Sequence, residues 1–258
     1  MSDFIGTKLT MNLGERSYDI ILKNGALENL YQFARLDRRV AVVTDSGVPA
    51  QYAQRVADQC REARIITVPQ GEASKSFKIL ESVLQQMLDF NMGRGDLVVA
   101  VGGGVVGDLA GFAASIYMRG IDFINCPTTT LSMIDSSIGG KTAVDLGDTK
   151  NIVGAFWQPK LVIVDPDTLA TLPRRHYING LAEAVKASLL ADPELFGIFE
   201  KGDIDGQINE IIYRSLRFKK NIVEQDETER GMRKALNFGH TIGHGIEAVK
   251  GIKGRRTV

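Results

Sequence analysis

The stretch 96–112 constrains the fold more than any other, because it joins a short apolar run to a cluster of glycines. The run from Leu97 to Val101 is bounded by Asp96 on one side and by the glycines on the other, which is the pattern of a buried parallel strand. The residues that follow the glycines are able to continue as a helix. Strand, tight turn and helix in this order predict one unit of an α/β fold.

Within this stretch, Gly102, Gly104 and Gly107 match the pattern G-x-G-x-x-G, the spacing that lets a pyrophosphate approach the backbone at a helix N-terminus. The usual dinucleotide fingerprint differs in two respects, because this turn follows roughly the third strand–helix unit and contains Asp108. Glycines at the end of a strand also occur where only a tight turn and close packing are needed. The pattern therefore indicates a nucleotide site in an unusual position, and a purely structural turn stays open.

The remaining pattern divides the chain into an alternating part and a helical part. A β-hairpin is predicted over 8–23, and beyond it strands alternate with helices, which implies a parallel sheet. A stripe of Phe77, Leu80, Leu84 and Leu88 predicts the buried face of one amphipathic helix. Strands are predicted at 39–44, 65–68, 96–101, 121–126 and 161–164, and helices at 26–35, 48–61, 77–90, 174–191, 194–200, 205–224 and 235–250.

Only helices are predicted after the last strand, so we expect a domain boundary near residue 170. The predicted fold class is an α/β N-terminal nucleotide-binding domain with a Rossmann-like parallel sheet over 1–170. An all-helical C-terminal domain is predicted over 171–258.

The overall charge excludes some classes of partner. The chain has 31 acidic and 31 basic residues, which argues against a nucleic acid or an anionic membrane as the main partner. Its N-terminus lacks the regions of a signal peptide, and no apolar run reaches the ~18 residues of a membrane span. Cys60 and Cys126 lack metal-type spacing and are interpreted as idle thiols in a reducing compartment. The sequence therefore predicts a cytoplasmic protein.

Polar residues follow several of the predicted strands, at Asp45, 70–75, Asp108 and 128–130. Because the carboxyl ends of parallel strands meet at one edge of a sheet, these residues are expected to lie near one another. Each of them alone has the residue types of an ordinary helix cap or turn.

The segment from Gly139 to Thr142 combines two glycines with Lys141, so that exposed backbone N–H groups stand beside a cation. It is not a Walker A loop, because Asp135 occupies the position of the first required glycine. Anion binding and a glycine turn with a solvated lysine both fit this pattern.

A histidine pair in the helical part indicates a metal. His240 and His244 are four residues apart, so both imidazoles can project into the same site. A catalytic zinc needs three protein ligands, and Glu183 or Glu247 would supply the carboxylate. Glu183 also stands three residues from Lys186, where an exposed ion pair is the alternative interpretation.

Taken together, these motifs resemble the 3-dehydroquinate synthase family, from about Tyr18 to Lys250. The family has an α/β nucleotide-binding domain followed by a helical domain. Its members are homodimers that use NAD and zinc, for which Co²⁺ is a possible substitute. They convert the sugar phosphate 3-deoxy-D-arabino-heptulosonate 7-phosphate to 3-dehydroquinate and phosphate in the shikimate pathway. The motifs that carry the resemblance lie at 71–75, 102–112, 127–129, 135–142, 180–186 and 237–244.

The resemblance also implies roles for individual residues. NAD contacts are implied for Asp45, Gln70, Gly71, Glu72, Ala73, Ser74, Lys75, Gly103, Gly104, Val105, Val106, Gly107, Asp108, Thr128, Thr129, Lys141, Lys150, Thr168, Leu169, Ala170 and Thr171. Gln70 departs from the family, which often has Asp there. Substrate contacts are implied for Asp135, Lys141, Asn151, Lys186, Lys219, Arg233, Asn237 and His244, with Arg119 reaching across the dimer to the phosphate. Zinc ligands are implied at Glu183 and His240.

One departure from the family is larger. The family's third zinc ligand is a histidine further along the chain, and no histidine follows His244 before Val258. The sequence is therefore expected to be a fragment, with a helical domain incomplete at its C-terminus.

Other functions stay open. One is a sister sugar-phosphate cyclase acting on glucose 6-phosphate or sedoheptulose 7-phosphate. Another is an inactive fragment that binds NAD or pairs with other chains, and another a metal-dependent polyol dehydrogenase. Lys219 and Arg233 favour a substrate with a carboxylate, and therefore favour 3-dehydroquinate synthase over the sister cyclase.

Overall fold

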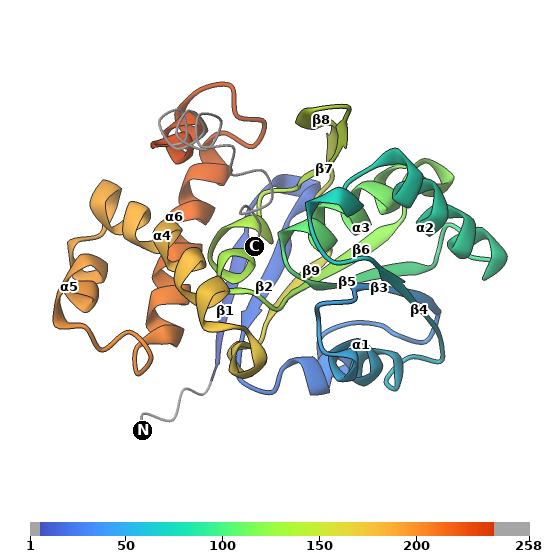
Figure 1. Cartoon of the computed structure of the whole chain (residues 1–258), viewed down its shortest axis with the longest axis horizontal. Coiled ribbons are helices and arrows are strands. Elements are labelled where there is room, and N and C mark those ends of the chain that lie inside the picture. Colours follow the sequence, from blue (N-terminus) through green and yellow to red (C-terminus); the bar gives the residue numbers. More distant parts are fainter. Residues whose placement is uncertain (1–5, 240–258) are drawn as a thin grey trace.

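The computed structural model describes residues 6–239, and its centre is a seven-stranded sheet in the order β1-β2-β9-β6-β5-β3-β4 (Figure 1). The predicted hairpin is present at one edge, where β1 and β2 pair antiparallel, and all other neighbours pair parallel. The α/β fold class is therefore confirmed. The strands are β1 (Thr7–Met11), β2 (Tyr18–Leu22), β3 (Arg39–Asp45), β4 (Glu62–Val68), β5 (Leu97–Gly102), β6 (Asp122–Pro127) and β9 (Leu161–Val164).

Helices cover both faces of the sheet. Helix α1 (Ala50–Ala57) lies on one face, and α2 (Phe77–Asp89) and α3 (Gly104–Ile116) lie on the other (Figure 1). Successive residues of β5 serve the two layers alternately, since Val98 packs with α2 and α3 while Val99 packs with α1. This two-sided burial explains why β5 is an uninterrupted apolar run.

The face predicted for α2 is only partly correct, since Leu80 is buried and Leu84 packs against the core but the other two residues do not. Its buried residues are Leu80, Val83 and Met87, whereas Phe77 and Leu88 are 47% and 58% exposed. Apolar residues occupy two neighbouring rows of this helix, and contact with the sheet selects the row that contains Val83. Periodicity alone does not distinguish the two rows.

Two further elements differ from the sequence prediction. The segment predicted as a helix over 26–35 contains a 3₁₀ helix at Leu27–Gln32. Residues after the predicted anion loop form an unpredicted hairpin of β7 (Lys141–Leu146) and β8 (Thr149–Phe156). Most of β8 is exposed, so it lacks the apolar alternation by which a half-buried strand is recognised.

The helical part follows β9 and a 3₁₀ helix at Pro166–Thr171. Its core is continuous with the sheet, because Tyr177 and Leu181 of α4 belong to the same apolar cluster as Ile20 of β2 and Val162 of β9. The division at residue 170 stays a prediction. The helices are α4 (Arg174–Ala191), α5 (Pro193–Lys201), α6 (Ile208–Gln225) and a 3₁₀ helix at Met232–Asn237.

The predictions for 174–191, 194–200 and 205–224 agree closely with α4, α5 and α6, and the prediction for 235–250 extends beyond the described residues. Within 6–239, no helix is both long enough and apolar enough to cross a bilayer.

Candidate active site

Two cavities lie near the carboxyl ends of the parallel strands. The first, the glycine-turn cavity, has a volume of about 260 Å³ and lies beside the turn between β5 and α3. It brings together predicted nucleotide residues that follow β3, β4, β5 and β6, as expected for one edge of a parallel sheet. Its lining consists of the predicted residues Asp45, Gln70, Gly71, Gly103, Val105, Thr128, Thr129 and Thr171, together with Gly47, Val48, Pro49, Tyr52, Leu172, Pro173 and His176.

Each glycine of this turn has a different structural role. A Cβ on Gly102 would lie 2.6 Å from Val106 Cγ2, so this glycine allows strand and helix to pack closely. A Cβ on Gly103 would stand 3.1 Å from Thr129 Cγ2 at the cavity wall. Helix α3 begins at Gly104, and the free N–H groups of its first turn favour an anion there. Backbone N–H groups, hydroxyls and the Asp45 carboxylate are a donor and acceptor set that fits the phosphates and ribose hydroxyls of a dinucleotide.

Asp45 closes the turn after β3. Its carboxylate accepts hydrogen bonds from the N–H groups of Gly47 and Val48, at 2.7 and 3.2 Å from one oxygen. Burial raises the pKa of this carboxyl, and the two N–H groups offset part of the effect. Gln70 packs over Gly47, where an added Cβ would lie 2.2 Å from Gln70 Cδ.

Other predicted nucleotide residues do not line this cavity. Lys75 is 4% exposed, and its Nζ lies 2.5 Å from Asp108 Oδ2 and also donates to Asn151. Lys150 lies 3.4 Å from Glu72 in an ion pair at the rim. The remaining members of the set, which do not line the glycine-turn cavity, are Ala73, Ser74, Gly104, Val106, Gly107, Thr168, Leu169 and Ala170.

The second cavity, the charged cavity, measures about 620 Å³ and lies among α3, the β7–β8 hairpin and the helical part. It collects most of the predicted substrate residues from segments far apart in the chain. They are Asp135, Lys141, Asn151, Lys186, Lys219, Arg233 and Asn237, joined by Asp108. The first turn of α3 separates the cavities, because Val105 lines one and Asp108 lines the other.

The charges of this cavity are paired. Lys219 is buried, and its Nζ donates to the Asp135 carboxylate at 2.8 Å and to the Asp135 carbonyl oxygen at 2.7 Å. Burial acts to raise the pKa of Asp135, but the Lys219 ammonium prevails and holds it below its usual range. Burial raises the pKa of Asp108 even though Lys75 lies beside it.

Arg233 is the most deeply placed cation of the charged cavity. It is 1% exposed, donates to the carbonyl oxygen of Gly139 at 3.0 Å and also donates to the carbonyl oxygen of Glu227. A Cβ on Gly139 would lie 2.5 Å from Arg233 Nη2, and Gly139 has a φ of +95°. The predicted anion loop therefore needs glycine at position 139 for two reasons: the positive φ, and the space that Arg233 occupies beside it.

Sequence reasoning missed several residues that line these cavities, among them Glu229, Tyr52 and His176. Glu229 forms an ion pair with Lys141 and accepts a hydrogen bond from Asn237 Nδ2 at 3.0 Å. Its φ of +59° is unusual for a side-chain-bearing residue, and such a residue often marks a functional loop. Tyr52 and His176 line the glycine-turn cavity. His176 is half-buried in the first turn of α4.

Some predicted residues are not gathered in this way. Arg119 is exposed and lines neither cavity, in a short turn where Met118 and Arg119 have φ values of +52° and +68°. Its role across a dimer stays a prediction. His240, His244 and Glu247 lie outside the described residues.

The predicted metal ligands are only partly within the described chain. Glu183 lies on α4, where it forms an ion pair with Lys186 at the charged cavity. Across 6–239, no group of three or more His, Cys, Asp or Glu side chains is placed to hold a metal. Glu183 fits the role of one carboxylate ligand, and the rest of the predicted set depends on His240.

Comparison with solved structures defines the class of protein. The chain is similar to 2-deoxy-scyllo-inosose synthase complexed with carbaglucose-6-phosphate, NAD⁺ and Co²⁺, with a TM-score of 0.84, 25% identity, and coverage of 97% of this chain and 72% of that one. It is also similar to the 2-epi-5-epi-valiolone synthase ValA of Streptomyces hygroscopicus with NAD⁺ and Zn²⁺ bound, with a TM-score of 0.81, 31% identity, and coverage of 92% and 69%. The fold is therefore that of the sugar-phosphate cyclases.

Sequence comparison identifies the family within this class. Residues 65–179 match the N-terminal model of 3-dehydroquinate synthase and residues 180–256 match its C-terminal model. The 3-dehydroquinate synthase of Caulobacter vibrioides is 46% identical over 93% of this chain and 69% of its own length. The chain belongs to the 3-dehydroquinate synthase family, a family of enzymes, and the prediction made from its motifs is confirmed.

Proposed function

We propose that this chain converts 3-deoxy-D-arabino-heptulosonate 7-phosphate to 3-dehydroquinate and phosphate, with NAD in the glycine-turn cavity and the sugar phosphate in the charged cavity. The observation that carries this proposal is the meeting of the predicted substrate residues in one cavity, directly beside the glycine turn. The solved relatives that hold NAD⁺ with Co²⁺ or Zn²⁺ support the same pair of cofactors.

In the glycine-turn cavity, the first turn of α3 binds the pyrophosphate through its N–H groups. Asp45 accepts hydrogen bonds from ribose hydroxyls, since its carboxylate is already held in place by the backbone of the turn. Asp108 of the charged cavity pairs with Lys75 and lies one helical turn after the start of α3, near the place where nucleotide and substrate come together.

In the charged cavity, the chain's cations bind the two anionic groups of the substrate. Lys219 and Arg233 are buried and held by neighbouring oxygens, so they are oriented before a substrate carboxylate arrives. Lys141 is 47% exposed at the side chain and lines the cavity in an ion pair with Glu229, where it stabilises the departing phosphate. The cavity holds one flexible intermediate through several steps, which is largely a matter of positioning.

Glu183 and His240 would hold zinc, with cobalt as a possible substitute. When bound, NAD and zinc would supply reversible hydride transfer and Lewis acidity, respectively. The cations and carboxylates of the chain bind the substrate and move its protons. We also propose the homodimer, with Arg119 reaching the phosphate of the neighbouring subunit, and the division into domains at 1–170 and 171–258.

Phosphate release from the heptulosonate phosphate tests the function when NAD is supplied in catalytic amounts. We expect release to require NAD while no NADH accumulates, because the hydride returns to the substrate. Accumulation of NADH in proportion to turnover would contradict the proposal and favour a polyol dehydrogenase. Release from glucose 6-phosphate or sedoheptulose 7-phosphate, but not from the heptulosonate phosphate, would favour a sister cyclase.

A further inference from the structure

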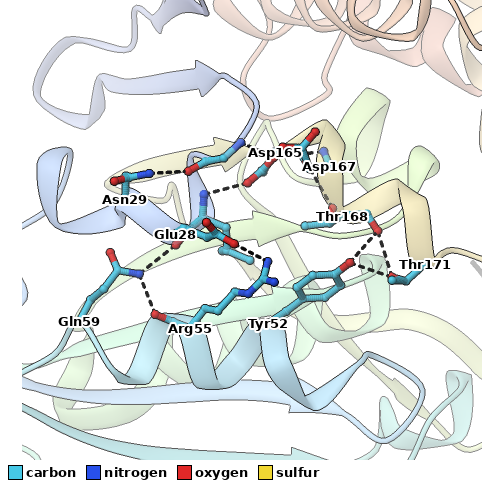
Figure 2. Close-up of polar contacts among 11 residues, drawn as sticks. Glu28, Asn29, Tyr52, Arg55, Gln59, Asp165, Asp167, Thr168 and Thr171 are labelled. Atoms are coloured by element: carbon cyan, nitrogen blue, oxygen red, sulfur yellow. Dashed lines mark hydrogen bonds and ion pairs between the residues drawn. The ribbon is translucent and has the colours of Figure 1, made fainter.

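Two of the segments that line the glycine-turn cavity, 45–52 and 171–176, are far apart in the chain. Tyr52 on α1 joins them. Its side chain lines the cavity and is 3% exposed. Its hydroxyl lies 2.9 Å from Thr171 Oγ1 and donates to the Thr168 carbonyl oxygen at 3.3 Å, as Figure 2 shows.

The 3₁₀ helix at Pro166–Thr171 is therefore held at both ends. At its start, the buried Asp165 carboxylate accepts N–H groups of Gly25, Leu27 and Asp167 at 3.0, 3.0 and 3.1 Å. None of these four residues lines the glycine-turn cavity, whereas Tyr52 and Thr171 both do.

Thr171 is itself exposed, and Leu172, Pro173 and His176 follow it along the wall. Within the described residues, the hydroxyl of Tyr52 thus makes the side-chain contact that ties this end of the 3₁₀ helix to α1. A wall that is already in position binds a ligand without first being ordered, so such a contact increases affinity even if it never touches the ligand.

We propose that Tyr52 is a positioning residue for the nucleotide. Its hydroxyl fixes the position of Thr171, and of the cavity wall at 172–176, relative to the turn at Asp45. This assignment rests on the proposed function and adds a residue to it.

The test uses the full chain and titration calorimetry with NAD. Tyr52→Phe removes the hydroxyl and keeps the ring, and we expect the Kd for NAD to rise about threefold to tenfold, the range of one net hydrogen bond. The melting temperature of the variant should change little. The Thr168 carbonyl oxygen still accepts a hydrogen bond from the Thr171 hydroxyl, at 3.2 Å, and is not left unpaired.

A matched control lies in the same network. Glu28→Gln removes the ion pair with Arg55, at 2.8 Å, which also joins α1 to the 26–32 segment but lies outside the cavity (Figure 2). We expect its Kd for NAD to equal that of the unmodified chain. An equal rise in both variants would overturn the assignment, because general loosening of α1 would then explain it.

A double-mutant cycle shows whether the effect passes through Thr171. Once Thr171→Val has removed the partner hydroxyl, adding Tyr52→Phe should change the Kd for NAD no further. An unchanged Kd in the single Tyr52→Phe variant, or a full additional effect in the double variant, would overturn the assignment. If the unmodified chain bound no NAD at all, the proposed function would fail first and this assignment with it.

Discussion

The two cavities share the first turn of α3 but are built in opposite ways. Among the described residues of the glycine-turn cavity, Asp45 is the one carboxylate, and the other lining groups are backbone, hydroxyl, amide, imidazole or apolar groups. The charged cavity instead holds Asp108, Asp135, Lys141, Lys186, Lys219, Glu229 and Arg233. One cavity therefore recognises its ligand mainly by shape and backbone, and the other mainly by charge.

The difference has consequences for mutation. In the charged cavity, removing a side chain leaves an opposite charge without its partner, and the effect is large. In the glycine-turn cavity, adding an atom matters more than removing one, since backbone N–H groups cannot be deleted by substitution. The predictions below separate the cavities on this basis.

Lys141→Ala should have the largest effect. We expect phosphate release to fall by about 100-fold or more, the scale of one preorganised electrostatic donor. Lys160→Ala is the control, because Lys160 is exposed and lines neither cavity within the described chain. Unchanged phosphate release in Lys141→Ala would show that the loop is only structural.

Glu183→Gln should weaken zinc binding by about 100-fold, because an amide replaces an anionic ligand. Zinc titration with a competing chelator measures the change, and the exposed Glu200→Gln on α5 is the control. Equal zinc affinity in both variants would remove Glu183 from the ligand set.

Lys219→Met tests the ion pair of Lys219 with Asp135, and its effect on the free energy of unfolding should depend on pH. We expect the free energy of unfolding to fall by about 2 kcal/mol at pH 7, less than for a fully buried pair, because the Asp135 side chain is 34% exposed. In the unmodified chain, the depressed pKa of Asp135 contributes stability above about pH 4, which is lost as the pH falls through the folded-state pKa.

In the variant, Lys219 no longer offsets the burial of Asp135, and only the more distant Lys186 and Lys141 still lower its pKa, so the pKa of Asp135 should rise and the loss should be smaller at pH 5 than at pH 7. Urea unfolding at pH 7 and pH 5 measures the difference. Lys220→Met, which removes the neighbouring pair with Glu224, should cost only about 0.5 kcal/mol. A loss for Lys219→Met that does not shrink at pH 5 would contradict the role of Asp135.

Gly103→Ala should have the smallest effect. The added methyl would stand 3.1 Å from Thr129 Cγ2, so we expect the Kd for NAD to rise about tenfold while the fold is kept. Gly95→Ala is the matched control, because a Cβ there meets no neighbour within 4 Å. If Gly103→Ala bound NAD as tightly as Gly95→Ala, the nucleotide would not lie against this turn.

The sequence itself was sufficient for the parallel strands of the main sheet and for the glycine turn after β5. β5 needs both faces apolar, and the turn after it needs glycine, so these requirements are met by neighbours in the chain. The polar residues at the ends of β3, β5 and β6 were also predictable, because parallel strands place their carboxyl ends at one edge.

The charged cavity was predicted only through resemblance to a family, since no local pattern relates Asp135 to Lys219 or Lys141 to Glu229. Their pairing results from α6 packing beside the short π-helix at Ser132–Ser136 and from the loop that follows α6. The same limit explains the α2 face, the exposed β8 strand and the position of His176. Local periodicity and turn chemistry depend on neighbouring residues, so the sequence alone determines them. The choice between two apolar rows of a helix and the pairing of charges from distant segments depend on which surfaces pack together. Only the tertiary structure decides that.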